Sequence, residues 1–303
     1  FVSRHSIGVK DGQLCFDQRP FLVIGLRCSN ALVSDRAVGQ LIQNLPIFAD
    51  YGINTITVYL MGSRFGDVTG YHRDGMLNPL YTARLARLLN ALDEHTMAAL
   101  VGCLYWGGSR AKHEDWTQKD AESAVRHTLV WLTEQDARHV FIDVDNEGMG
   151  QRLHGFDDRA LVMAAKSVDP RFVIGTNFRG PPPVEADIAL HFAHDVPDKP
   201  YVETEGTPDN APGGYWGTYS KKPGLYGYRN VGVYTAAMKR NQIDRTVEHL
   251  ASRRGYVLAS TWLQAPPPQG PNHEPGGSGG AGDPGIRWWL EFVRDTYGEV
   301  LVD

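Results

Sequence analysis

Residues 141–148 read Phe141-Ile-Asp-Val-Asp-Asn-Glu-Gly148. We interpret residues 140–147 as a buried β-strand that ends in the pair Asn146-Glu147. A second segment, Pro200-Tyr-Val-Glu-Thr-Glu-Gly206, is interpreted as another strand that ends in a glutamate, Glu205. The chain alternates strand and helix patterns around both segments. Two glutamates at strand ends in such a chain are predicted to face each other across the mouth of a barrel.

The strand pattern extends outward from these two segments. Six further strands are predicted at residues 21–27, 53–60, 97–105, 172–177, 187–192 and 256–262. Their apolar runs are nearly continuous, as expected for strands covered on both faces. Eight strands alternating with helices in 303 residues are typical of an α/β protein with a single (β/α)8 TIM barrel. We expect one catalytic domain over residues 1–303, since no linker or internal repeat is present.

Helix signals separate most of these strands. Ser34, Asn78 and Thr117 are predicted to cap helices, the last with Asp120 in a capping box. Pro46 is expected to kink or split the first helix. Further helices are predicted at residues 157–168, at 233–250, where the helix is continuous or in two pieces, and from 286 onward. The prolines at 181–183 predict a short or missing fifth helix.

Composition excludes several classes of function. The chain is 42% hydrophobic and 21% charged, which is ordinary for a soluble globular enzyme. A net charge of -5 without a basic run argues against nucleic acid as a partner. No apolar stretch is long enough to span a membrane. Three widely spaced cysteines without a CxxC motif indicate buried thiols, and no cofactor or metal motif is evident.

Numbering begins at Phe1, so a signal peptide removed before this residue would favour a secreted or periplasmic location. The location is otherwise unknown, as is the oligomeric state.

The polar residues at the strand ends are the candidate site, because barrel enzymes react at that face. Glu147 is the candidate general acid, since a carboxyl group near a second acid has a raised pKa. Asn146 beside it is expected to hydrogen-bond a sugar hydroxyl. Glu205 is the candidate nucleophile, because it lies nearer the mouth than Glu203, which points to the same side. Glu203 remains the alternative nucleophile or a supporting partner.

These motifs resemble the clan A glycoside hydrolases, the retaining superfamily that includes the family 5 enzymes. Asn146-Glu147 is similar to the clan's Asn-Glu pair at the end of strand four. Thr204-Glu205-Gly206 is similar to its nucleophile segment at the end of strand seven. The resemblance implies double displacement, with Glu205 as nucleophile and Glu147 as acid/base. It implies an oligo- or polysaccharide substrate.

Two more positions are similar to the clan's pattern, and one departs from it. His191 or His194 matches the aromatic or histidine of strand six, and Trp262 matches the tryptophan after strand eight. Family 5 enzymes often carry an arginine on strand two. Here Arg27 ends strand one and Arg64 follows strand two. This departure favours a separate family within the same clan.

The arginines suggest a more specific substrate. Arg27, Arg64, Arg110 and Arg179 follow predicted strand ends, with Lys112 nearby. Because guanidinium groups suit bidentate recognition of carboxylate or sulfate, an acidic glycan is one hypothesis. Ordinary salt bridging is the other.

Aromatic side chains near the strand ends are candidates for stacking on sugar rings, Trp106 and Trp262 above all, with Trp216 as a further one.

Two other functions remain open. Asp143, Asp145 and Glu147 alternate along one strand. Together with Glu203, Glu205 and His191 they form a credible O/N site for Mn²⁺ or Mg²⁺. That arrangement would suit a metal-dependent sugar isomerase or lyase. A barrel that binds carbohydrate without cleaving it is the third reading. The sequence leaves the sugar, the linkage and exo or endo action undecided.

Overall fold

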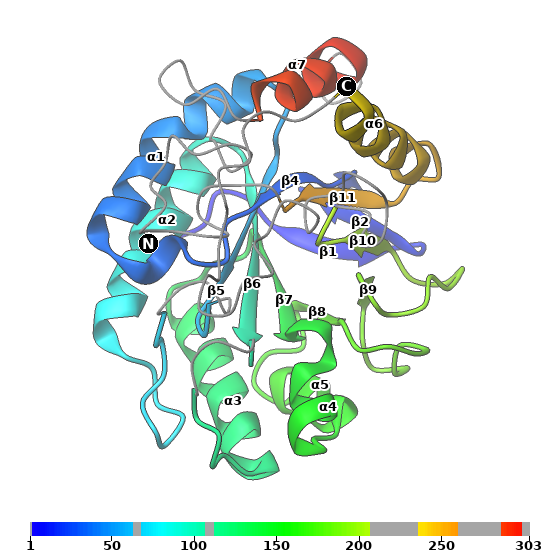
Figure 1. Cartoon of the computed structure of the whole chain (residues 1–303). Helices are drawn as coiled ribbons and strands as arrows, with labels where there is room; N and C mark the ends of the chain where they lie inside the picture. The colour runs from blue at the N-terminus through cyan, green and yellow to red at the C-terminus, as the bar shows by residue number, and fades with distance from the viewer. Residues whose placement is uncertain (1, 63–67, 107–111, 207–235, 260–285, 299–303) are drawn as a thin grey trace.

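The computed structural model describes residues 2–62, 68–106, 112–206, 236–259 and 286–298. Within these residues a closed barrel of parallel strands forms, as predicted, with helices on its outside (Figure 1). The strands in barrel order are β4 Ile24–Arg27, β5 Thr55–Tyr59, β6 Ala98–Leu104, β7 Val140–Asp145, β8 Val173–Thr176, β9 Ile188–Leu190, β10 Tyr201–Glu203 and β11 Gly255–Leu258. The (β/α)8 architecture is therefore confirmed.

The helices follow the predicted order. They are α1 Asp35–Asp50, α2 Pro79–Glu94, α3 Gln118–Glu134, α4 Met149–His154, α5 Asp158–Lys166, α6 Ala236–Ala251 and α7 Arg287–Tyr297, with short 3-10 turns η1 Ala31–Val33 and η2 Asn146–Gly148. No helix lies between β8 and β9, whose connection is fully described, so the prediction made from the prolines is confirmed. The short helix α4 was not predicted.

The predicted caps begin the first three helices. The Ser34 side chain accepts a hydrogen bond from Ala37 N, and the Asn78 side chain accepts one from Leu80 N. Thr117 and Asp120 form a complete capping box. Each cap satisfies backbone N–H groups that a helix start leaves without partners, so the sequence locates these starts well.

Pro46 does not split its helix, so the predicted split was wrong. Helix α1 runs without a break from Asp35 to Asp50. A proline removes one backbone hydrogen bond, but Leu41, Leu45 and Phe48 on the same helix are fully buried against the barrel. Burial of this apolar face outweighs the loss of one bond.

A three-stranded antiparallel sheet precedes the barrel and was not predicted. Its strands are β1 Ile7–Lys10, β2 Gln13–Phe16 and β3 Arg19–Pro20. Ile7, Leu14 and Phe16 belong to the same apolar cluster as the side chains inside the barrel. The sheet thereby closes the amino end of the barrel. The sequence signal was Asp11-Gly12, a hairpin turn pair at positive φ between two short apolar runs.

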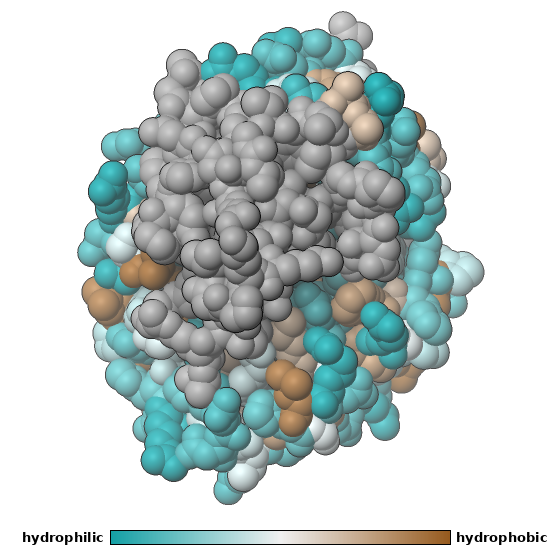
Figure 2. Space-filling view, in the orientation of Figure 1, coloured by the Kyte–Doolittle hydropathy of each residue, from teal (hydrophilic) through white to brown (hydrophobic). Residues whose placement is uncertain are grey.

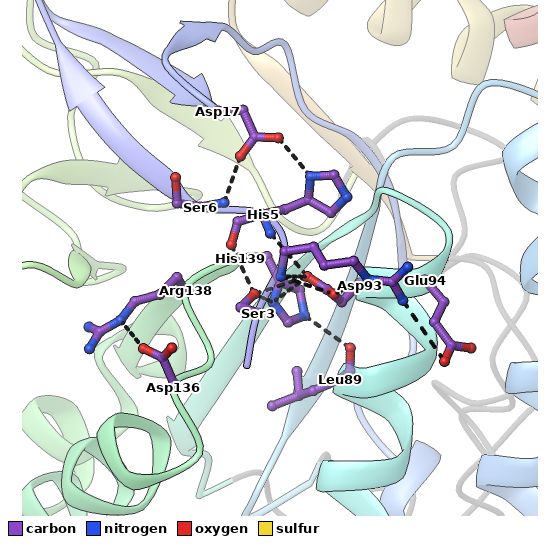
Figure 3. Close-up of polar contacts among 11 residues, drawn as sticks. Ser3, His5, Ser6, Asp17, Leu89, Asp93, Glu94, Asp136, Arg138 and His139 are labelled. Atoms are coloured by element: carbon purple, nitrogen blue, oxygen red, sulfur yellow. Dashed lines mark hydrogen bonds and ion pairs between the residues drawn. The ribbon is translucent and has the colours of Figure 1, made fainter. Parts of the chain in front are cut away.

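The segment before this sheet is held by Asp93 on α2 (Figure 3). The Asp93 carboxylate accepts hydrogen bonds from the backbone N–H groups of Arg4 and His5, at 2.9 and 3.2 Å. Ser3 Oγ lies 2.7 Å from Nδ1 of His139, and Nε2 of His139 lies 3.0 Å from Leu89 O. Ser3, Asp93 and His139 thus fasten the N-terminal segment at the amino end of the barrel.

On the face drawn in Figure 2, the coloured residues are mostly hydrophilic, with separate hydrophobic side chains. Among the described helices, none has the length and apolar character needed to cross a membrane.

Candidate active site

Polar side chains gather at the carboxyl end of the barrel strands. Arg27 ends β4, Tyr59 ends β5 and Glu203 ends β10. Glu147 follows β7 and His191 follows β9. Because parallel strands share one carboxyl edge, residues distant in sequence meet here.

Strand β7 ends at Asp145, two residues before the predicted end at Glu147. Asn146, Glu147 and Gly148 form the 3-10 turn η2 instead, and Glu147 has φ 52° and ψ 20°. Gly148 is also left-handed, and a Cβ there would lie 2.6 Å from Cβ of Phe178. The turn redirects Glu147 from the strand, and a left-handed non-glycine residue of this kind is frequent at functional sites.

Glu205 is buried and paired with Arg27. Its carboxylate is only 2% exposed, and its Oε1 lies 2.8 Å from Nη2 of Arg27. The guanidinium group also donates to Thr204 O at 3.1 Å and to Oδ1 of Asn146 at 2.7 Å. The guanidinium group lies over the aromatic rings of Tyr59 and Tyr105, with its Cζ 5.0 and 5.7 Å from the ring centres. Arg27 is thus an internal counter-ion of the site.

Glu147 and Glu205 face each other. One carboxylate oxygen from each, together with one ring nitrogen of His191, lies within 4.8 Å of the other two. Glu147 keeps 19% of its side chain exposed, whereas Glu205 is covered. Arg152 approaches Glu147 from outside, with Nη2 3.4 Å from Oε2.

The pKa of Glu147 is raised to about 7. Burial is the main cause, and the nearby Glu205 carboxylate adds to it. His191, Arg27 and Arg152 act in the opposite direction. Glu147 therefore holds a proton on a substantial fraction of molecules at neutral pH, as a general acid requires.

A network of hydrogen bonds orients Asn146. Its Oδ1 accepts hydrogen bonds from Arg27 and, at 3.0 Å, from the hydroxyl of Tyr59, with Asn177 Nδ2 at 3.4 Å. Tyr59 and Asn177 also contact Oδ2 of Asp143, at 2.6 and 3.0 Å. Nδ2 of Asn146 is buried and has no partner among the described residues. With Oδ1 engaged by donors, Nδ2 is left as a donor for a ligand.

Glu203 and His191 form a tight pair beside the two acids. Nδ1 of His191 lies 2.5 Å from Oε1 of Glu203, and the same oxygen accepts the Glu205 backbone N–H at 2.8 Å. Burial disfavours the charged form of both side chains. Even so, the charges of Glu203, Glu205 and Glu147 raise the pKa of His191 to about 9. The charge of His191, together with hydrogen bonds from His191 and the Glu205 backbone, lowers the pKa of Glu203 to about 2. Glu203 is thus a partner of His191 and of the Glu205 backbone.

The remaining predicted substrate-binding residues are placed differently. Trp106 is buried, with His154 and Phe156 packed against its ring. Arg179 is exposed and stacks on Phe192 at 4.7 Å. His194 is exposed, in the loop after β9. Arg64 and Trp262, like Arg110 and Trp216, lie outside the described residues.

The acids Asp143, Asp145 and Glu147 do not all point toward one site. Asp143 contacts Tyr59 and Asn177, while both oxygens of Asp145 accept the Gly150 backbone N–H at 2.8–3.0 Å. Within the described part of the chain, the group suited to a metal ion comprises Glu147, His191 and Glu205.

The sequence prediction overlooked Tyr59 and Asn177 as site residues. Both stand at strand ends, Tyr59 as the last residue of β5 and Asn177 directly after β8. The same strand-end rule that selected the glutamates would have found them.

No model of a known protein family matches the chain, and no curated protein matches it. Solved structures do. A glycoside hydrolase aligns with a TM-score of 0.62 at 12% identity, over 99% of this chain and 76% of its own length. An exo-beta-1,4-mannosidase from Opitutaceae bacterium strain TAV5 gives 0.60 at 13% identity, over 93% and 60%. A family 5 glycoside hydrolase from Bacteroides vulgatus gives 0.58 at 14% identity, over 97% and 70%.

These likenesses confirm the fold that the resemblance implied. The chain has the (β/α)8 barrel found in clan A glycoside hydrolases, including family 5. The chain spans 60% of the length of the mannosidase.

Proposed function

We propose that this protein is a glycoside hydrolase that acts by retaining double displacement. The observation that carries the proposal is the pair Glu147 and Glu205, whose nearest carboxylate oxygens lie within 4.8 Å at the carboxyl end of the barrel. Retaining glycosidases hold their two carboxyl groups about 5–5.5 Å apart, whereas inverting enzymes separate them by about 6.5–9.5 Å to admit a water molecule.

The two acids differ in the way that the reaction needs. Glu205 is buried and ion-paired with Arg27 at 2.8 Å, and this contact fixes the position of its carboxylate for attack as a nucleophile. Glu147, with a pKa of about 7, suits proton donation. A Glu205 oxygen bonds to the anomeric carbon while the glycosidic C–O bond breaks and the Glu147 proton passes to the leaving oxygen. Glu147 then takes a proton from water, whose oxygen displaces Glu205.

Asn146 supports this reaction as a substrate-binding residue. Its Nδ2 is buried beside Glu147 and lacks a partner in the described structure. A sugar hydroxyl would supply the missing acceptor, which removes the cost of an unpaired buried donor.

The test is the variant Glu205→Ala, assayed with an aryl glycoside. We expect turnover to fall by roughly 10⁴-fold or more, since a nucleophile has no substitute. Azide should restore the reaction and yield a glycosyl azide of inverted configuration, because it enters the space left by the carboxylate. Glu122→Ala, which removes a surface carboxylate paired with Arg126, is the control. An active Glu205→Ala variant, or one that azide does not rescue, would contradict the assignment.

A finer proposal concerns the substrate. Arg152 on α4 and Arg179 after β8 are exposed cations, and Arg152 lies beside Glu147. An acidic glycan with uronate or sulfate groups would match them. Because two structural neighbours are named as acting on β-1,4-mannan or mannosides, neutral mannosides belong in the same panel. Equal rates on charged and neutral versions of the preferred glycan would refute the acidic preference.

A metal-dependent sugar isomerase or lyase is the second candidate, because Glu147, His191 and Glu205 offer O/N ligands to one point. Exhaustive treatment with chelator separates the two. A glycosidase of the proposed type keeps its full activity, while the second candidate loses it until metal is added back.

A further inference from the structure

His191 has the geometry of an oriented ligand. Its Nδ1 is engaged by Glu203 at 2.5 Å, and Glu203 is itself fixed by the Glu205 backbone N–H. The ring stacks on Phe192 with centres 4.1 Å apart. The other nitrogen, Nε2, is buried and has no hydrogen-bond partner among the described residues, and the side chain is only 7% exposed.

A histidine whose Nδ1–H is donated to a carboxylate presents Nε2 as the remaining ligand atom. This arrangement is the usual support of metal-binding histidines, because the carboxylate fixes the ring and raises its basicity. Here one carboxylate oxygen of Glu147, one of Glu205 and one ring nitrogen of His191 all lie within 4.8 Å of one another. The three residues follow β7, β9 and β10.

We propose that Glu147, His191 and Glu205 bind one divalent cation of the zinc class when no saccharide is present, so that the cation and the saccharide exclude each other. The inference rests on the proposed function, since it makes the two catalytic acids the ligands of an inhibitor. On binding, the cation replaces any proton on Nε2 and on Glu147, and these protons pass to solvent.

The ligand chemistry selects the ion. One imidazole and two carboxylates suit zinc, whereas magnesium and calcium prefer oxygen ligands alone. Ligand atoms about 2.1 Å from a common ion lie at most about 4.2 Å apart, so a small closure is enough to bring the trio onto one ion. Glu147, with 19% of its side chain exposed, has room to move. Arg27 beside Glu205 offsets part of the charge, so the site should bind more weakly than a structural zinc site.

The experiment titrates the metal-free protein with ZnCl₂ by isothermal calorimetry, then repeats the titration kinetically with an aryl glycoside that the protein cleaves. We expect one zinc site per chain, a KM that rises with zinc and an unchanged kcat. MgCl₂ should show neither binding nor inhibition.

Two variants test the assignment, with folding checked by thermal unfolding. His191→Gln should lose zinc binding, and Glu203→Gln should weaken it by about 10–100-fold, since it removes only the orienting carboxylate. His72→Gln, at an exposed histidine, is the matched control and should bind zinc like the parent. His191→Gln keeps a similar side-chain volume, so we expect it to fold. Glu203→Gln provides a second variant for the same test.

The outcomes separate the two proposals. Absence of zinc binding, zinc binding that His191→Gln leaves unchanged, or inhibition that saccharide does not relieve would overturn the cation site and leave the hydrolase standing. A protein that is inactive without metal and activated by zinc would keep the site but overturn the metal-free hydrolase mechanism.

Discussion

Two buried histidines lie beside carboxylates at opposite ends of the barrel, and their charges differ: His191 is positively charged at neutral pH, and His139 is neutral. At the carboxyl end, Glu203 contacts His191 directly, and the pKa of His191 is about 9. At the amino end, burial lowers the pKa of His139 to about 4, because the nearest Asp93 oxygen is 3.7 Å away and only partly offsets it. Ser3 and Leu89 bond the His139 ring instead (Figure 3).

The difference in pKa distinguishes a charged histidine at the carboxyl-end cluster from a neutral histidine in the cluster that holds the N-terminal segment. Ser3, Asp93 and His139 include the residue types of a hydrolytic triad, but Nε2 of His139 is engaged by the Leu89 carbonyl. A neutral ring then donates through Nε2 and accepts the Ser3 hydroxyl at Nδ1, so no nitrogen is left to act as base. We therefore assign stability to the amino-end cluster and chemistry to the carboxyl-end cluster.

The largest expected effect is at Glu147. Glu147→Gln should lower kcat/KM by about 10⁴-fold for a glycoside with a poor leaving group, and far less for an aryl glycoside with a good one. In the parent, activity should fall as pH rises through about 7, because Glu147 must be protonated to act as acid. That alkaline limb should vanish in the variant. A limb that persists near pH 7 would assign the acid to another residue.

Asp93→Ala should act on stability alone. Its carboxylate is fully buried and accepts the backbone N–H groups of Arg4 and His5. Loss of these charged hydrogen bonds should lower the free energy of unfolding by about 3 kcal/mol, measured by urea titration. The neighbouring Glu94→Ala, half-exposed and 3.9 Å from Arg4, is the control and should cost little. A large loss of kcat with little loss of stability in Asp93→Ala would reverse the assignment of the two ends.

Glu203→Gln sharpens the comparison at the other end. Without its anionic partner, burial should lower the pKa of His191, and kcat should fall by about 10–100-fold. A neutral His191 no longer lowers the pKa of Glu147, so the alkaline limb of the pH profile should move to higher pH. A role in folding alone would leave that limb in place, and Glu248→Gln at an exposed surface pair is the control.

The smallest effect is the pH dependence at His139. Its folded pKa of about 4 lies below the ordinary value of 6.5, so the unfolded chain takes up a proton that the folded one refuses. Stability is therefore present above pH 6.5 and lost as pH falls toward 4, by about 2 kcal/mol between pH 7 and 5. His139→Gln should lack this loss in urea titrations at the two pH values, whereas the exposed His72→Gln should keep it.

Much of the fold was readable from local patterns. Apolar runs located the strands, and Ser34, Asn78 and Thr117 marked helix starts, because those signals act within a few residues of one another. The strand-end rule selected Glu147 and Glu205 for the same reason. The split predicted at Pro46 does not occur, because burial of the helix against the barrel outweighs the local preference of proline. The N-terminal sheet was missed, although Asp11-Gly12 marks its hairpin turn.

Spacing along the chain predicted two acids at the barrel mouth but not their separate environments. Closure of the barrel brings Arg27 to Thr204 across 177 positions of sequence, and to Glu205 beside it, and places His191 between Glu203 and the two acids. Burial and charge at those distances then set the pKa values of Glu147 and His191. Because electrostatic energy depends on separation in space and on exposure to solvent, it follows from the folded arrangement and cannot be read from residue order.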